Sequence, residues 1–311
     1  MDLLGGILAP SPAVRQIHEG KGQFFRIETS HFYQANRHIG DCVALAGFAI
    51  LGGHSPGLRL DRNQQRARIA FALGMIGLGI LGLVSGDFAL QWQPVPAGVP
   101  GREGLAYGSA VLMLAGGAGL LFRGTAAWSA RILFPYLLIW LLLLKVPHVV
   151  TAPLIAVNWL GCGEIAVLMT GGWVLFASLT GPRDGRHVKF ARALFGLALP
   201  AIGLSHFVYA RQTAGMVPPW LPFRIGWAYL TGAGHVAAGI GVLFSIYPRL
   251  AATMEAGMLG VFTLLVWGPA ILAAPTTRLP WTAFLISWAI AAAAWVVAAS
   301  IPRKDSVPRG V

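Results

Sequence analysis

The sequence predicts an all-α integral membrane protein with eight transmembrane helices, arranged as two four-helix repeats of parallel orientation. Three observations lead to this fold class: an apolar composition, eight apolar stretches of membrane-spanning length, and an internal duplication. Of 311 residues, 56% are hydrophobic and 11% charged, and the mean hydropathy is +0.67. Because a soluble domain carries about 25% charged residues, this composition excludes a water-soluble globule and a largely disordered chain.

Eight stretches reach the roughly 20 apolar residues that a membrane-crossing helix needs. They lie at about 68–86, 104–122, 128–147, 154–178, 191–210, 226–246, 252–273 and 281–301. The apolar run at 42–53 is too short to cross, and the polar residues before it are unlike a signal peptide. Residues 1–66 are therefore expected to form a basic N-terminal extension, unless the true start of the protein lies further along the chain.

The basic residues favour one orientation in the membrane. With the N-terminus inside, the cytoplasmic segments hold 18 Lys and Arg residues and the opposite segments hold 5. By the positive-inside rule, we expect a multi-pass protein of the cell (inner) membrane. Both the 1–66 extension and the 302–311 tail are then cytoplasmic. This distribution accounts for the net charge of +12 through membrane lipid as the partner, without nucleic acid.

An internal duplication divides the apolar part of the chain. Residues 95–107, VPAGVPGREGLAY, match residues 217–229, VPPWLPFRIGWAY, at an offset of 122. Further pairs keep this offset downstream or differ by 124 upstream: Gly117/Gly239, Trp159/Trp281, Ser178/Ser300, and then Arg68/Arg192 and Gly79/Gly203. The expected repeats, 67–180 and 190–301, each hold four spans. Because four is even, the two copies have the same orientation, related by a pseudo-twofold axis along the membrane normal.

Several motifs in these copies resemble one family of small membrane proteins. They are Gly203-Leu204-Ser205-His206-Phe207, the Pro-rich 217–222, Trp227-Ala228-Tyr229, and Asn158-Trp159 followed by Glu164. With these motifs, residues 67–301 resemble two tandem copies of the DoxX-like family. The resemblance implies a four-helix bundle for each copy. It also implies similarity to the membrane subunit of thiosulfate:quinone oxidoreductase, and hence a link to quinone redox chemistry.

Glu164 is the first candidate catalytic residue. It lies about ten residues into the fourth span, roughly 15 Å deep. An ionised carboxylate at that depth costs several kcal/mol unless it is paired, so intramembrane acids are functional candidates. The alternative is a neutral glutamic acid that bonds a neighbouring helix.

His206 and His235 are the other two candidate catalytic residues. Their depths from opposite faces differ by about 5 Å, so they could share one pocket, near the depth of Glu164. Histidines could relay the protons of quinone reduction. Haem ligation is less well supported, and packed, hydrogen-bonded histidines are the alternative. We expect no metal site, because the two cysteines, Cys42 and Cys162, have no metal-ligand spacing.

Arg102 and Arg224 open the second span of each copy, where a cation opposes the helix dipole. They could bind an anion or a quinone carbonyl, or they could reach lipid headgroups as interfacial anchors. Tyr107, Tyr229 and Trp220 lie at the same interface. They could stack on a quinone ring or belong to an aromatic belt.

Other charged residues near this face are expected to be less specialised. Lys145 and His148 are predicted to reach the interface. Asp87 and Arg211 occupy corresponding loops with opposite charge, so they could form a weak pair across the pseudo-axis.

Three functions fit these features. The first is a quinone-linked oxidoreductase subunit, or an accessory protein of sulfur or redox metabolism. The second is a non-catalytic scaffold that recruits a soluble redox partner on the cytoplasmic side through basic residues, namely Arg183, Arg186, Lys189 and Arg192. The third is a small-solute or proton transporter. The absence of phosphate-binding, esterase and zinc-protease motifs disfavours ATPases and hydrolases, but the sequence leaves catalysis itself open.

Overall fold

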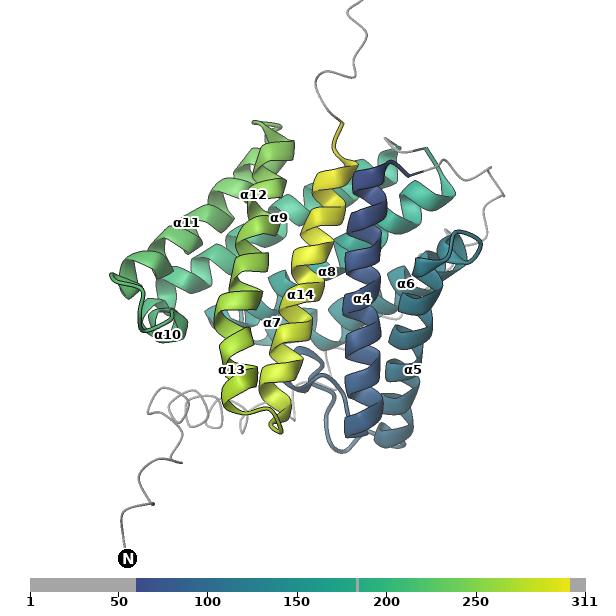
Figure 1. Ribbon diagram of the computed structural model, residues 1–311, viewed down its shortest axis with the longest axis horizontal. Helices are drawn as coiled ribbons and strands as arrows, with labels where there is room; N and C mark the ends of the chain where they lie inside the picture. The colour runs from purple at the N-terminus through teal and green to yellow at the C-terminus, as the bar shows by residue number, and fades with distance from the viewer. Residues whose placement is uncertain (1–59, 183–184, 303–311) are drawn as a thin grey trace, which may run out of the picture.

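The computed structural model describes residues 60–182 and 185–302, and this part of the chain is all-helical, without a strand (Figure 1). The long helices are α4 (Arg62–Ser85), α5 (Arg102–Leu121), α6 (Ala126–Leu144), α8 (Ala156–Thr180), α9 (Arg186–Val208), α11 (Arg224–Leu243), α12 (Pro248–Phe262) and α14 (Arg278–Ser300). Shorter elements are the 3-10 turn η2 (Leu90–Trp92), α7 (Val146–Thr151), α10 (Ala210–Met216), the π-helical η3 (Thr263–Trp267) and α13 (Gly268–Ala273). Each predicted span overlaps one long helix. Most of the predicted 1–66 extension and of the 302–311 tail lies outside the described residues.

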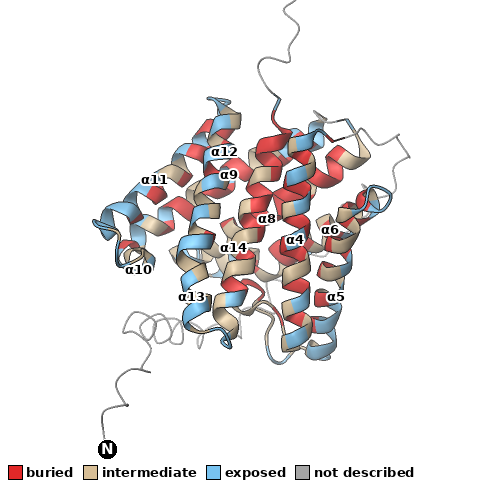
Figure 2. Ribbon diagram, viewed as in Figure 1, coloured by how far each residue is buried: buried red, intermediate tan, exposed pale blue. Residues whose placement is uncertain are grey.

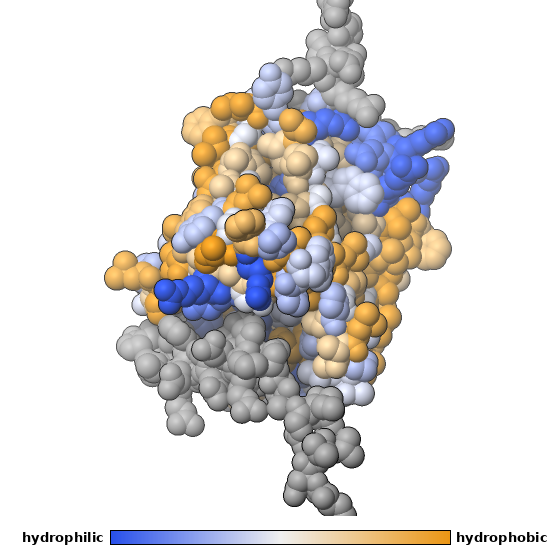
Figure 3. Space-filling model, turned by 60° about the vertical axis from the view of Figure 1, so that its left-hand side comes forward, coloured by the Kyte–Doolittle hydropathy of each residue, from blue (hydrophilic) through white to orange (hydrophobic). Residues whose placement is uncertain are grey.

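Seven of these segments are long and apolar enough to cross a membrane, which indicates a multi-pass membrane protein. The long helix that does not reach this criterion is α11, whose sequence includes His235 and several glycines. Apolar side chains cover much of the face shown in Figure 3, and strongly hydrophilic residues gather in separate patches. Eight crossings therefore remain a prediction, although eight long helices are present in the described residues.

The first helix begins earlier than the apolar stretch predicts, because a capping box extends it. The Asp61 carboxylate accepts a hydrogen bond from the Gln64 backbone N–H at 2.8 Å, and the Gln64 side chain accepts one from Asp61 N–H at 3.1 Å. This reciprocal arrangement satisfies the free N–H groups of the first turn. The helix ends at Gly86, which adopts a left-handed conformation with φ of 59° that costs glycine little.

Helices α4, α8 and α14 form the centre of the bundle, where buried residues concentrate (Figure 2). Small residues let these helices approach closely. A Cβ added to Gly74 would lie 2.9 Å from Ala289 Cβ, and one added to Gly171 would lie 2.6 Å from Ala293 Cβ. Such contacts are the usual means of helix association in lipid, where the hydrophobic effect contributes little. By contrast, α11, α12 and α13 carry mostly exposed or half-buried residues.

The same order of helix contacts recurs in the two halves of the described chain. Helix α4 packs on α5 as α9 packs on α11, and α6 packs on α8 as α12 packs on α14. Four close approaches of a glycine to a backbone carbonyl accompany the first two contacts: Gly79 to Ala110, Gly117 to Ala72, Gly203 to Gly232 and Gly239 to Gly196. Between the halves, α8 packs on α9 and α14 packs on α4.

The described chain enters and leaves at the same end of the bundle, because α4 runs down and α14 runs up beside it (Figure 1). At the opposite end, residues 86–101 fold against the bundle instead of extending away from it. Trp92 of this segment is buried, and its carbonyl accepts a 2.7 Å hydrogen bond from Trp140 Nε1. This segment shapes one of the polar sites described below.

Candidate functional site

The structure brings His206 and His235 together inside the second half of the chain. His206 is on α9 and His235 on α11, and their ring centroids lie 4.9 Å apart. The glycines at this crossing permit the contact, since a Cβ on Gly232 would lie 2.9 Å from His206 Cβ. The depth argument from the sequence therefore anticipates their proximity.

The carboxylate beside these histidines is Glu255 of α12, which the sequence analysis missed. His235 Nδ1 and Glu255 Oε1 lie 2.7 Å apart, with side-chain exposures of 1% and 0%. The second carboxylate oxygen, Oε2, is also buried and has no hydrogen-bond partner among the described residues. The sequence did offer one signal for Glu255, namely an acidic residue within a predicted apolar span. However, Glu255 falls near the predicted start of its span, whereas α12 begins earlier and buries it.

His206 lies between this buried pair and the surface of the protein. Its Nδ1 donates to the Ile202 carbonyl at 3.0 Å, so Nε2 is the nitrogen left to take up or release a proton. The His206 ring is half-buried and stacks on Phe262, with centroids 6.4 Å apart. Exposed Phe207 and Tyr229 stack on each other nearby, with centroids 6.0 Å apart.

We name His206, His235 and Glu255 the histidine site. It offers three proton-binding groups in a row, from a fully buried carboxylate to a half-buried imidazole. The 2.7 Å contact between His235 and Glu255 lets the imidazole donate a hydrogen bond to the buried carboxylate. Within residues 60–182 and 185–302, no group of three or more His, Cys, Asp and Glu residues could hold a metal ion.

Glu164 belongs to a different polar cluster, under the 86–101 segment. Trp92 Nε1 donates to Glu164 Oε2 at 2.9 Å. Lys145 lies in the same region, because its Nζ donates to the Gln91 carbonyl at 2.8 Å. Lys145 is only 7% exposed, so the prediction that it reaches the interface is wrong. The helix break between α6 and α7 turns Lys145 inward, where it helps to hold the segment.

A second network of side chains lies beside that cluster. Buried Gln93 donates to the Tyr136 hydroxyl at 2.8 Å, and Ser109 and Tyr136 share a 2.7 Å hydrogen bond. A small cavity adjoins Gln93 and Ser109, and its wall includes Gly82 and Met113. Under the predicted duplication, those two residues correspond to His206 and His235.

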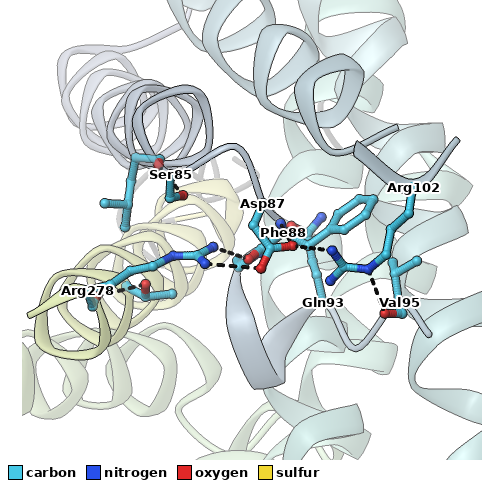
Figure 4. A network of polar contacts seen from close by, with 10 residues as sticks. Ser85, Asp87, Phe88, Gln93, Val95, Arg102 and Arg278 are labelled. Atoms are coloured by element: carbon cyan, nitrogen blue, oxygen red, sulfur yellow. Dashed lines mark hydrogen bonds and ion pairs between the residues drawn. The ribbon is translucent and has the colours of Figure 1, made fainter. Parts of the chain in front are cut away.

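Asp87 pairs with two arginines at this end of the bundle (Figure 4). Asp87 Oδ1 lies 2.7 Å from Arg102 Nη1, and Asp87 Oδ2 lies 3.1 Å from Arg278 Nη1. Arg278 also donates to the Phe88 carbonyl. The predicted pair with Arg211 is therefore wrong, because the start of α14 brings Arg278 to Asp87 instead.

The charge of Asp87 is stabilised by this network. Partial burial acts to raise the pKa of Asp87. The Phe88 N–H and the guanidinium groups of Arg278 and Arg102 outweigh that effect and hold the pKa below its usual range. Because the network joins the α4–α5 loop to the start of α14, it ties the two halves of the chain together.

The remaining candidates lie apart from the histidine site or on the surface. Arg102 pairs with Asp87 and donates through Nε to the Val95 carbonyl at 3.3 Å. Arg224 is exposed and forms no hydrogen bond with any described residue. Tyr107, Tyr229 and Trp220 are also exposed. Of the aromatic candidates, Tyr229 alone is placed near the histidine site, through its stacking with Phe207.

Comparison with known proteins gives one match. A family model described as a domain of unknown function, DUF8561, matches residues 195–293. That segment runs from near the middle of α9 into α14, and it contains all three residues of the histidine site. No curated protein and no solved structure matches the chain.

Proposed function

We propose that this chain is a DoxX-like membrane protein that serves quinone-linked redox chemistry, and that its histidine site handles the protons. One observation carries the proposal: His206 lies half-buried among aromatic residues at the apolar surface, and the buried His235–Glu255 pair lies directly behind it. A lipid-soluble substrate approaching from the membrane would meet His206 first. A water-soluble substrate would have no need of such a position.

The proposal includes eight spans in two four-helix units. The support is the corresponding helix contacts and the four glycine approaches, whose positions differ by the offsets 122 and 124 found in the sequence. Trp159 and Trp281, a pair at offset 122, also make the same bond: each donates through Nε1 to a proline carbonyl six residues earlier, at 2.8 Å. The matched family segment spans the second of these units.

The residues of the chain suggest how protons would move. Quinone reduction takes up two electrons and two protons. The electrons would come from a reduced sulfur donor or a soluble redox partner. His206 Nε2 would give a proton to one substrate oxygen, and the His235–Glu255 pair would return a proton to His206. A second transfer of the same kind to the other oxygen would complete the quinol. Phe207, Tyr229 and Phe262 would flank the substrate ring.

The test uses the purified full chain in vesicles that contain a quinone, supplied with thiosulfate and a candidate soluble partner. We expect donor-dependent quinol formation, and His206→Gln should reduce it strongly. His187→Gln is the matched control, because His187 is an exposed histidine on the same helix. A photoreactive azidoquinone should also label α9 or α12 near His206, which tests binding without any partner. The proposal would be refuted if no label were found near His206 and no donor-dependent reduction of quinone occurred.

A proton-coupled transporter is the second candidate, favoured by the same buried titratable pair. Uptake of solute into proteoliposomes that depends on a pH gradient and on Glu255 would favour transport over redox chemistry. A scaffold role would use the predicted basic strip of Arg183, Arg186, Lys189 and Arg192. Arg186 and Lys189 are exposed, Arg192 donates to Ser300, and Arg183 lies outside the described residues. Charge reversal at residues 186 and 189 should then release a soluble partner in a pull-down.

The proposed location is the inner membrane with both chain ends in the cytoplasm, which rests on the distribution of basic residues. A cysteine introduced at Gly98 or Trp220, in a background without Cys42 and Cys162, should react with an impermeant reagent from outside the cell. One at Gly124 should not. Labelling of Gly98 and Trp220 from opposite sides would refute the two-unit topology.

A further inference from the structure

Arg68 is a buried cation without a partner in residues 60–182 and 185–302. It lies in the second turn of α4 and is 6% exposed. Its Nε is buried without a hydrogen bond, and Arg68 forms no hydrogen bond or ion pair with any described residue. Of the acids in that part of the chain, the closest in sequence is Asp61, two turns away, which caps the helix through Gln64. A guanidinium in this position is costly unless a negative charge reaches it.

A second arginine lies level with Arg68. Helices α4 and α5 are antiparallel, and their register is fixed by two contacts, Gly79 against Ala110 and Gly117 against Ala72. Continuing this register from Gly117 past the end of α5 brings Arg123 to the level of Arg66, in the same turn of α4 as Arg68. Arg123 lies close enough to Arg68 for the two positive charges to repel each other. Arg123 is exposed at the end of the bundle, so the pair faces outward through it.

The corresponding arginine in the second half shows what Arg68 lacks. Arg192 donates through Nε to Ser300 Oγ at 3.0 Å, and it also donates to the Ser300 carbonyl. Ser178 corresponds to Ser300, yet it forms no hydrogen bond with Arg68. In the part of the chain that the structure describes, the arginine at this position therefore has hydrogen-bond partners in the second half and none in the first.

We propose that Arg68 and Arg123 bind a phosphate group, supplied by the headgroup of an anionic membrane lipid. Each guanidinium group presents the fork of donors that phosphate oxygens accept, and two such groups at one end of the bundle can bind the same phosphate. The first turns of α4 and the α5–α6 turn lie at one end of the bundle, the level at which lipid headgroups contact membrane proteins. A lipid phosphate there offsets the repulsion between the arginines and partners the buried Nε.

The test is native mass spectrometry of the full chain in mild detergent, with added phosphatidylglycerol, phosphatidylcholine or inorganic phosphate. We expect the native chain to retain one phosphatidylglycerol in preference to phosphatidylcholine. Arg68→Gln should weaken this binding about tenfold, as expected for the loss of a charge-assisted contact. The matched control is Arg66→Gln, which removes an exposed charge from the same turn of α4 and should leave binding within about twofold.

Thermal unfolding in phosphatidylcholine shows whether Arg68→Gln is folded. If it is not, Arg123→Gln decides the matter, because exposed Arg123 can be changed without disturbing the core, and it should also weaken binding of phosphatidylglycerol. Equal retention by the native chain and the folded variant would overturn the proposal. Retention of inorganic phosphate with no preference for the lipid would overturn the lipid as its source.

Discussion

The crossing of α9, α11 and α12 differs from the crossing of α4, α5 and α6 at the positions that matter most for chemistry. The histidine site occupies the first crossing. The corresponding positions in the second are apolar: Gly82, Met113 and Leu133. The glycine contacts that let the helices approach are nevertheless shared. Close packing at this crossing therefore does not require ionisable groups, and this difference supports the functional role that we propose for the histidine site.

The largest expected effect comes from giving the second half the residues of the first. Glu255→Leu alone leaves His235 buried without its partner, and breaking a buried pair in this way costs about 3–5 kcal/mol. The double variant His235→Met/Glu255→Leu introduces the apolar residues found at Met113 and Leu133. It should regain most of that stability, because a well-packed apolar pair often replaces a buried ion pair without loss. Denaturant unfolding in detergent measures both.

The same two variants separate function from packing. Both should lose the proton-dependent activity, whatever their stability. A double variant no more stable than Glu255→Leu would mean that the two crossings are packed differently. Their comparison as equivalents would then fail.

An intermediate effect is expected where the two halves are most alike. Gly79→Ala and Gly203→Ala each place a methyl group within 2.6 Å of a backbone atom of the facing helix. Overpacking of this kind costs about 1–3 kcal/mol, and it should be similar at the two sites. Gly108→Ala and Gly257→Ala are matched controls, since nothing lies within 4 Å of the added group. A large loss at Gly203 with none at Gly79 would contradict the proposed duplication.

The smallest effect concerns the link between the halves. Asp87→Asn removes the negative charge that pairs with Arg102 and Arg278. Because Asp87 is partly exposed, the free energy of unfolding should fall by only about 1 kcal/mol. The pKa of Asp87 is depressed in the folded protein. Its contribution is therefore present above its ordinary value of about 3.9, and it disappears as the pH falls through the lower folded value. Thermal unfolding from pH 6 to pH 3 should thus be less pH-dependent in Asp87→Asn than in the native chain. Equal pH dependence would contradict this account.

The helices were predictable because each depends on a local property, a run of apolar residues of sufficient length. The proximity of His206 and His235 also followed from local arithmetic, namely their depths along neighbouring spans. Contacts between distant parts of the chain could not be predicted in this way. Glu255, and the partnership of Asp87 with Arg278 in place of Arg211, depend on which helices become neighbours, and hydropathy does not specify that.

Irregular backbone was the second feature that the sequence did not predict. Lys145 follows an apolar span, and the sequence alone suggested that such a lysine extends to the lipid surface. The break between α6 and α7 and the inward fold of residues 86–101 reverse its direction, so that it meets the Gln91 carbonyl. Composition finds spans, but it does not find segments that fold back against them.

Two of the interfaces between the halves, α8 with α9 and α4 with α14, correspond under the proposed duplication, yet only the first is joined by the chain. Since the described chain begins and ends at one end of the bundle, a circular permutant is feasible. A short linker would join residue 302 to residue 60, and new termini would open between α8 and α9. In such a protein the units exchange their order in the chain while every helix keeps its neighbours.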